Sequence, residues 1–236
     1  MSADYGQIDF RMAAHLINDP AIIAAYTANA DTDYHQIISD LTGIPRNPTY
    51  AGAPNTKTLN LSLAFGAGPG KIAFTMGMSY EVKEYRKKMM YTPGPEAQAV
   101  FEKYHKTVPG VKAFSKQAEI IAKDTGYVRT QSGRRLRFPR GIGAHKAAGL
   151  LFQANAADVN KYGLIMVDEH IRKERLPARL MLSVHDEIAV SMPNDPAMAN
   201  GINQAFTNFN NPGSPLTFRV PIRSSVAITP TWWKGK

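Results

Sequence analysis

The chain has 236 residues, of which 44% are hydrophobic and 20% charged, enough apolar material for one large globular domain or two small ones. It contains no cysteine, which excludes disulfides and thiolate metal sites and leaves a reducing compartment as the default. No run of 18 uncharged apolar residues is present, so no membrane-spanning helix is predicted. Asp4, Asp9 and Arg11 near the start are incompatible with a signal peptide.

The formal net charge of +9 is confined to one segment. Residues 81–146 hold 15 Lys or Arg and 6 Asp or Glu, whereas the rest of the chain holds 13 of each kind. A local excess of one sign favours a polyanion as partner. A lysine-rich helical face exposed to solvent is the alternative explanation.

The first half of the chain is predicted to be mostly helical. Residues 2–5 fit the end of a strand, and residues 44–54 form a loop with three prolines. Asn55 or Thr56 is expected to cap the helix that follows this loop. Helices are predicted where apolar residues recur at helical spacing between Pro or Gly breaks, over 7–17, 21–27, 33–41, 55–65, 72–76, 81–90, 96–106 and 111–123.

The second half alternates hairpins and helices. A basic hairpin is predicted over 126–139, with its turn at Ser132-Gly133. The longest helical pattern follows over 145–172. The remaining predictions are a hairpin over 180–190, a helix over 196–209, a strand over 218–228 and an end sealed by Trp232-Trp233.

The hairpin over 180–190 carries the most informative pattern. Two apolar runs with β-branched residues flank His185, Asp186 and Glu187. Carboxylates at the tip of a rigid hairpin suit a site for a hard cation, which prefers oxygen ligands. An ordinary hairpin with a polar turn is the alternative, and the stretch taken alone favours it.

Three separated segments form an ordered set of motifs. They are Asp-Tyr-Gly-Gln-Ile-Asp-Phe-Arg-Met-Ala-Ala-His-Leu at residues 4–16, Lys57-Thr58-Leu59-Asn60 followed by Phe65-Gly66, and Val184-His185-Asp186-Glu187. In this order they resemble motifs A, B and C of the family A DNA polymerases, the DNA polymerase I-like group, in a phage-type form. Further segments between motifs B and C stand in the family's order, so the resemblance extends from Asp4 to Trp233.

The resemblance implies an α+β fold. Its parts are a polymerase palm, an antiparallel sheet with the motif C hairpin, and α-helical fingers. The palm would begin with motif A in residues 1–30, the basic fingers would occupy 31–125, and the palm would resume over 126–236. The thumb and exonuclease domains of the family have no counterpart in this sequence. We therefore expect the C-terminal half of a split or truncated enzyme, with a second polypeptide docking at the strand that ends in Asp4.

The resemblance also implies template-directed DNA synthesis, in which a nucleotidyl group passes from a dNTP to the primer 3′-hydroxyl. Asp4 and Asp186 would share two Mg²⁺ ions, with the backbone carbonyl of Tyr5 as a further ligand. Lys57 would meet the triphosphate at the start of its helix. Glu187 is expected to support the metals from outside their direct coordination. By itself Asp4 would fit a helix N-cap.

Matches to family positions assign further residues to the nucleotide and to primer–template DNA. The nucleotide-binding set is Tyr5, Gln7, Asp9, Lys57, Asn60 and Phe65. The DNA-binding set is Arg11, Arg134, Arg135, His145, Gln153 and His185. Asp9 would exclude a 2′-hydroxyl, and Gln153 and His185 would contact minor-groove acceptors common to all base pairs. The arginines would hold backbone phosphates. The expected location is the cytoplasm of a bacterium or of a phage-infected host.

The match is incomplete at three positions. Ala53 stands where the family has an arginine that reaches the triphosphate, and Arg46 is a candidate replacement. Leu61 replaces an aromatic residue at the incoming sugar, and Gly149 replaces an asparagine. A catalytically weak or inactive fragment that binds primer–template is therefore one alternative. A single-subunit RNA polymerase is another, and Asp9 and the Glu187 at the end of motif C argue against it.

Overall fold

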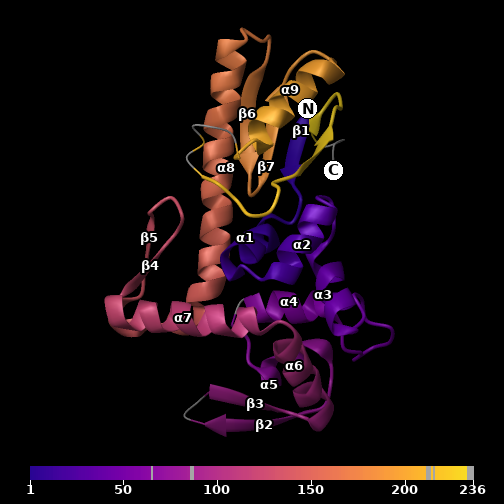
Figure 1. The fold of residues 1–236 in the computed structure, drawn as a ribbon, viewed down its shortest axis with the longest axis vertical. Helices are drawn as coiled ribbons and strands as arrows, with labels where there is room; N and C mark the ends of the chain where they lie inside the picture. Colours follow the sequence, from indigo (N-terminus) through magenta and orange to yellow (C-terminus); the bar gives the residue numbers. More distant parts are fainter. Residues whose placement is uncertain (65, 86–87, 211–213, 215, 233–236) are drawn as a thin grey trace.

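A computed structural model describes residues 1–64, 66–85, 88–210, 214 and 216–232 (Figure 1). The helix α8 (Ala147–Lys173) runs along much of the molecule. A four-stranded sheet lies beside its C-terminal half, and a group of shorter helices surrounds its N-terminal end. Separate hydrophobic clusters fill the sheet region, the helical region and the junction between them.

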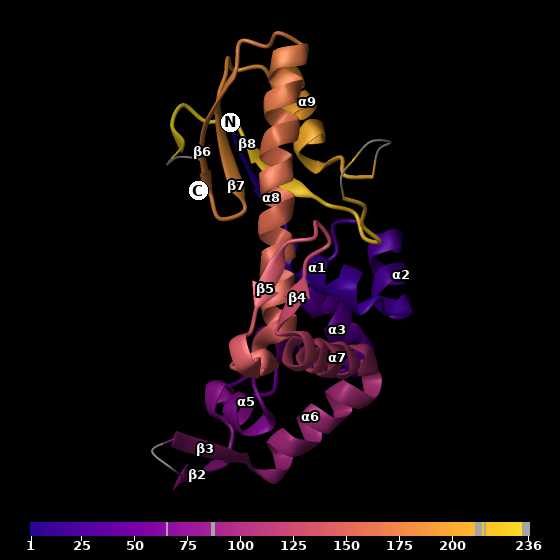
Figure 2. The same ribbon diagram turned by 90° about the vertical axis from the view of Figure 1, so that its left-hand side faces the viewer.

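The sheet has the strand order β6-β7-β1-β8, and each of its pairings is antiparallel. Its strands are β1 (Ser2–Tyr5), β6 (Arg179–Val184), β7 (Glu187–Ser191) and β8 (Ser224–Ala227). Helices α8 and α9 (Pro196–Thr207) cover one face, where Ala3 and Ile188 are buried (Figure 2). Side chains alternate along a strand, so Asp4 and its partner Glu187 point to the opposite face.

Two expectations about this sheet are wrong. The strand that ends in Asp4 pairs with β7 on one side and β8 on the other, so it offers no edge at which a second chain could dock. The strand expected over 218–228 is reduced to the four residues of β8. Pro221 interrupts the stretch because proline lacks a backbone N–H for the sheet. Phe218, Val220 and Ile222 are nevertheless buried.

The helices of the first half confirm the periodicity, with boundaries shifted by a few residues. They are α1 (Ile8–Ile17), α2 (Pro20–Ala28), α3 (Tyr34–Thr42), α4 (Thr56–Ala64), α5 (Pro69–Met76), α6 (Pro95–Thr107) and α7 (Pro109–Thr125). The side chains of Asp19 and Asp33 accept hydrogen bonds from backbone N–H groups in the first turns of α2 and α3, as capping residues do. None of the helices described here combines the length and the apolar composition needed to cross a bilayer.

The helix expected over 81–90 is wrong for the described residues, which form the antiparallel strands β2 (Tyr80–Tyr85) and β3 (Lys88–Pro93), while positions 86 and 87 lie outside the described residues. The basic residues of this segment follow a pattern that favours a helix, but tertiary packing stabilises the two strands instead. Tyr80 and Tyr91 lie on the hairpin face that packs against Phe74 of α5, with ring centroids 5.5 and 5.0 Å away. Gly70 allows this approach, because a side chain there would collide with the Tyr91 carbonyl.

The predicted hairpin over 126–139 is confirmed as β4 (Tyr127–Arg129) and β5 (Arg135–Arg137). Two short 3₁₀ turns, η1 (Pro139–Gly141) and η2 (Ala144–Lys146), connect it to α8. The long helix expected over 145–172 is confirmed as α8, after η2. The hairpin over 180–190 and the helix over 196–209 are confirmed as β6–β7 and α9.

Acid is expected to destabilise the fold through His15 of α1. This ring is 6% exposed, and its Nδ1 accepts the Arg219 N–H at 3.2 Å. Burial, with a smaller contribution from the Arg219 charge, lowers the pKa of His15 to about 4. The unfolded chain therefore binds this proton more readily, so stability present above pH 6.5 is lost as the pH falls through about 4, by up to ~3 kcal/mol. Urea unfolding between pH 7 and pH 4 should show a smaller decline for His15→Gln than for the wild type. Parallel curves would contradict this assignment.

Candidate active site

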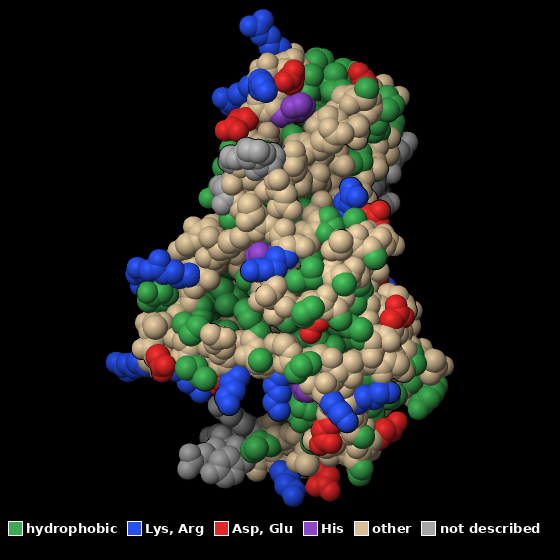
Figure 3. Space-filling model, viewed as in Figure 1, with side chains coloured by type: hydrophobic (Ala, Val, Ile, Leu, Met, Phe, Trp, Pro, Cys, Tyr) green, Lys and Arg blue, Asp and Glu red, His purple; other side chains and the backbone are tan. Residues whose placement is uncertain are grey.

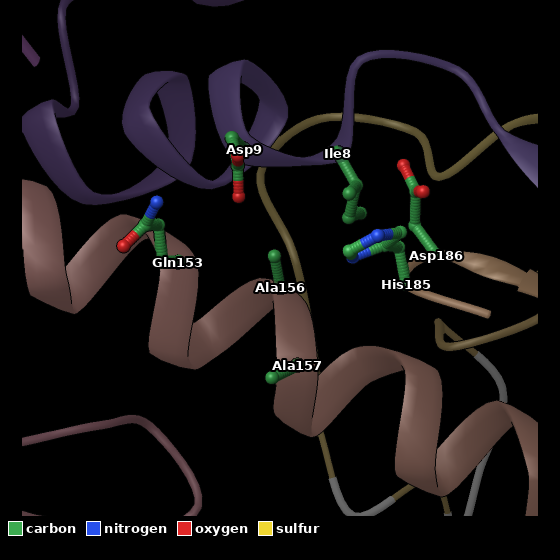
Figure 4. Close-up of a pocket in the computed structure, with 7 residues that line it drawn as sticks. All are labelled: Ile8, Asp9, Gln153, Ala156, Ala157, His185 and Asp186. Carbon is green, nitrogen blue, oxygen red and sulfur yellow. The ribbon is translucent and has the colours of Figure 1, made fainter.

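A cavity of about 370 Å³ lies where α1, α8 and the turn between β6 and β7 meet. Its lining residues are Ile8, Asp9, Gln153, Ala156, Ala157, His185 and Asp186 (Figure 4). Asp9 and Gln153 extend into it from α1 and α8, and His185 and Asp186 come from the hairpin turn. The cavity thus joins predicted site residues from motif A, motif C and the helix between the two hairpins.

The turn that carries His185 and Asp186 is held in an unusual shape. His185 adopts a left-handed backbone conformation with φ of 56°, which costs a non-glycine residue about 1 kcal/mol. Asn160 of α8 stabilises the turn, because its Nδ2 donates to the His185 carbonyl at 2.7 Å and to Ser183 Oγ at 2.9 Å. The strained backbone of His185 is held in place by the buried Asn160 amide, and strain of this kind often occurs at functional sites. The turn is therefore a candidate site.

Strand β1 brings motif A to the same turn. The Tyr5 N–H donates to the Asp186 carbonyl at 3.2 Å, and Asp4 lies opposite Glu187 in the β1–β7 register. The Tyr5 side chain points away into the core, where its hydroxyl donates to the Phe206 carbonyl at 2.6 Å. Gly163 leaves the space for this hydroxyl. The backbone of Tyr5, rather than its side chain, therefore approaches the turn.

The carboxylates around the turn differ in environment. Burial raises the pKa of Asp9, and the Asp186 charge raises it further. Glu187 is 3% exposed and accepts a hydrogen bond from Trp232 Nε1 at 2.9 Å. Trp232, which was expected to seal the end of the chain, is 37% exposed and contributes this hydrogen bond to a motif C residue, while Trp233 lies outside the described residues. A cation at the turn would relieve the repulsion between Asp9 and Asp186.

The residues at the turn could supply part of the ligand set for the expected magnesium ions. Among the described residues, no group of three or more His, Cys, Asp or Glu side chains is placed to hold a metal ion. Magnesium is usually bound by one or two carboxylates together with substrate phosphates and water. Asp4 and Asp186 on adjoining segments, beside the Tyr5 backbone, supply such a set.

Helix α4 presents one face to the cavity wall. Leu61 and Ala64 line a small apolar pocket of about 20 Å³ together with Asp9 and Gln153. Lys57 is exposed on the same face, one turn before Leu61. Asn55 caps the helix, because its Oδ1 accepts the Thr58 N–H at 2.9 Å. The lysine thus stands beside a helix N-terminus, where phosphate is favoured.

Two predicted site residues are buried away from the cavity. Arg11 is 4% exposed, and its guanidinium donates to the carbonyls of Gly6, Ala30 and Pro221. Asn60 is 2% exposed; it donates to His35 Nδ1 and accepts from the Tyr104 hydroxyl. The expected contacts of Arg11 with DNA and of Asn60 with nucleotide do not fit this burial. Both residues hold the fold together instead.

Other predicted residues have partners within the protein. The Oε1 atom of Gln7 accepts the Tyr34 N–H at 3.0 Å, at the start of α3. Arg46, the candidate replacement for the missing arginine, forms an ion pair with Asp33. Burial would raise the pKa of Asp33, but hydrogen bonds from Arg46, Gln7 and the backbone lower it. His145 lines a different cavity, of about 310 Å³, between α4, α6 and α7.

The predicted arginines of the basic hairpin have different environments. Arg134 forms an ion pair with Asp158 of α8 at 2.8 Å and donates to the Ala154 carbonyl at 2.6 Å. Arg135 is exposed on the hairpin surface. Phe65, expected at the nascent base pair, lies outside the described residues.

Sequence reasoning missed Asn160 and Ile8 at this site. Ile8 looks like an ordinary core residue in the helical pattern, so no signal marks it. Asn160 follows Gln153 by seven residues, which places both on one side of α8. A buried amide on a helix of this length is the signal that would have identified it.

The comparisons with known proteins agree with this architecture. The polymerase domain of Pol1 from M. smegmatis, solved in complex with DNA primer-template and dNTP, aligns over 95% of this chain with a TM-score of 0.76. The two sequences are 24% identical, and the match covers 38% of the solved chain. The fold is therefore that of a DNA polymerase domain.

The sequence profile described as DNA polymerase family A matches residues 1–234. The chain belongs to DNA polymerase family A. It is 37% identical to DNA polymerase DpoZ of Salmonella phage PMBT28 and 38% identical to that of Acinetobacter phage SH-Ab 15497, in each case over 98% of this chain. DNA polymerase I of Pseudomonas aeruginosa is 29% identical over 83% of it. The chain spans 38% and 37% of the two phage relatives.

Proposed function

We propose that this chain is the palm and fingers part of a template-directed DNA polymerase, with palm segments in 1–30 and 126–236 and fingers in 31–125. The observation that carries the proposal is the shared cavity of Asp9, Gln153 and Asp186, with Asp4 on the neighbouring strand. Membership of family A and the names of the relatives support the same activity. Cytoplasmic DNA of a bacterium or a phage-infected host would be its substrate.

The reaction is transfer of a nucleotidyl group. The primer 3′-hydroxyl gives up its proton to solvent, and its oxygen forms a bond to the α-phosphorus of the dNTP. The bond between the α-phosphorus and the oxygen bridging to the β-phosphate breaks, and pyrophosphate leaves with the bond electrons. Two Mg²⁺ ions, when bound, would lower the pKa of the 3′-hydroxyl and offset the charge on the leaving group. Asp4, Asp186 and the Tyr5 carbonyl would hold them, and Glu187 would support Asp4 from the adjoining strand.

The cavity walls suit a primer terminus with an incoming nucleotide. Asp9 extends from α1 where it would lie against the sugar and exclude a 2′-hydroxyl. Gln153 and His185 would contact the minor groove, where donors can read acceptors shared by every base pair. Ala156 and Ala157 have short side chains, which leave room for a nucleic-acid strand beside α8.

Lys57 is expected to bind the triphosphate. Lys57→Ala should raise the KM for dNTP and lower kcat, with a combined loss of about 10²-fold, because a charge at the helix N-terminus is removed. Steady-state primer extension over a dNTP series measures both parameters. Lys106→Ala, at an exposed position on α6, is the matched control and should behave as the wild type. Equal kinetics for the two variants would contradict the role of Lys57.

The relatives are longer than this chain, so we propose that a thumb and an exonuclease domain on further polypeptide, in one chain or a second one, complete the enzyme. Adding a cognate N-terminal polymerase fragment should increase both primer affinity and the length of the extension products. Processive extension by the 236-residue chain alone at physiological salt would contradict the need for a partner.

Primer extension with dNTPs or rNTPs, in Mg²⁺ or in EDTA, tests the function itself. Template-dependent incorporation of dNTPs that requires Mg²⁺ would support the polymerase. Tight primer–template binding without synthesis, even with the N-terminal fragment, would favour the binding fragment, for which Ala53 and Leu61 are the specific motivation. Preferential use of rNTPs would contradict the role of Asp9.

A further inference from the structure

The β4–β5 hairpin has two chemically distinct faces. Its register pairs Tyr127 with Arg137, Val128 with Leu136 and Arg129 with Arg135. Val128 and Leu136 face inward and pack in the hydrophobic cluster at the junction of α7 and α8. The outer face therefore consists of Tyr127, Arg129, Arg135 and Arg137, which we call the arginine face.

The arginine face concentrates positive charge at a cost to stability. Arg129 and Arg135 lie directly opposite one another, and like charges in that position repel. Their guanidinium carbons stand 5.4 and 4.7 Å from the centre of the Tyr127 ring. Among the residues described, no carboxylate lies within 4.0 Å of Arg129, Arg135 or Arg137. The three arginines are thus exposed and lack an acidic partner in the part of the chain that the structure describes.

The neighbouring Arg134 shows the contrast. Its guanidinium is tied to Asp158 and to the Ala154 carbonyl of α8, so the hairpin is anchored beside Gln153 of the cavity wall. The arginine face is therefore held at a defined place relative to the candidate active site. Figure 3 shows Lys and Arg side chains gathered on the protruding β4–β5 region. Hydrogen bonding and charge from Arg129, with the charge of Arg135, also lower the pKa of Tyr127.

We propose that the arginine face binds the phosphodiester backbone of the nucleic acid held by the polymerase, with Arg129 and Arg137 acting beside Arg135. This inference rests on the proposed function, because the ligand it assigns is the nucleic-acid strand that extends out of the cavity. Guanidinium groups match phosphate geometry and stay charged at all relevant pH values. Arg135 and Arg137, two residues apart, stand about 7 Å apart along the strand and reach separate phosphates. Contacts of this kind raise affinity without regard to sequence.

Arg129→Glu tests the proposal by separating DNA affinity from stability. Fluorescence anisotropy of a labelled primer–template, without dNTP, measures affinity over a range of salt concentrations. We expect at least tenfold weaker binding at low salt, and a log–log salt slope reduced by about one or more. Without DNA, the thermal midpoint should be maintained or raised, because a carboxylate opposite Arg135 replaces repulsion with attraction.

The matched control is Arg172→Glu, which changes the net charge equally. Arg172 is 78% exposed near the C-terminal end of α8, far along the helix from the cavity. Its reversal should alter affinity by about twofold at most, through long-range charge alone. Arg129→Gln, which removes the charge without reversing it, should lower the salt slope by about one.

Three results would overturn the proposal. The first is equal DNA affinity of Arg129→Glu and Arg172→Glu, and the second is an unchanged salt slope in Arg129→Gln. The third is that polyglutamate displaces the labelled primer–template as well as unlabelled DNA does at the same charge concentration. Because DNA binding is measured without dNTP, failure of the polymerase proposal can be distinguished from failure of the arginine-face proposal. A chain without synthesis that keeps the Arg129 effect contradicts only the polymerase function, whereas an active chain without the effect contradicts only the arginine face.

Discussion

Asp186→Asn is expected to abolish primer extension while primer–template affinity stays close to that of the wild type. The change removes one of the two carboxylates proposed to hold Mg²⁺ and keeps the size of the side chain in the hairpin turn. The stabilisation lost in the transition state is several kcal/mol, which corresponds to a rate reduction on the order of 10³-fold or more. The Tyr5–Asp186 hydrogen bond uses the backbone carbonyl, so the turn should keep its shape.

Single-turnover extension and equilibrium DNA binding, measured on the same preparation, provide the test. Asp40→Asn is the matched control, because Asp40 is a carboxylate on α3, away from the cavity, whose hydrogen bond comes from Gln36. Asp186→Glu keeps the charge but moves it by one methylene, and it should retain a small part of the rate. Synthesis by Asp186→Asn at the wild-type rate would refute nucleotidyl transfer at this cavity.

Arg11→Ala is expected to reduce the free energy of unfolding by about 3–5 kcal/mol. The guanidinium is buried and donates to the carbonyls of Gly6, Ala30 and Pro221, which join β1, α2 and the segment before β8. Its loss leaves three carbonyls without these donors and creates a cavity beside Tyr26, over which the guanidinium lies at 5.0 Å.

Urea denaturation followed by circular dichroism measures this effect. Arg11→Lys should recover only part of the stability, because an ammonium group cannot reproduce the planar donor arrangement. Arg172→Ala, at an exposed position, is the control and should change the free energy of unfolding by no more than about 0.5 kcal/mol. A loss below about 1 kcal/mol for Arg11→Ala would indicate that the network does not stabilise the fold.

The failures of sequence-based prediction have a common origin. Residues 81–90 carry basic side chains in a pattern that favours a helix. Those that the structure describes nevertheless belong to β2 and β3, because Phe74 supplies an aromatic surface for Tyr80 and Tyr91. The strand ending in Asp4 was expected at an edge, but β8 returns from the end of the chain to cover it. In both cases the deciding partner lies outside the segment itself and leaves no local signal.

The sequence by itself determined the family, most helices and the hairpin turn, because these depend on ordered motifs, short-range periodicity and capping. Only the tertiary structure decided which motif residues face the cavity. Asp9 lines it while Arg11 is buried, and Lys57 is exposed while Asn60 is buried. An α-helix turns by about 100° per residue, so residues two or three apart in one motif can point in different directions. Which direction is the interior depends on the elements that pack around the helix, and local sequence does not contain that information.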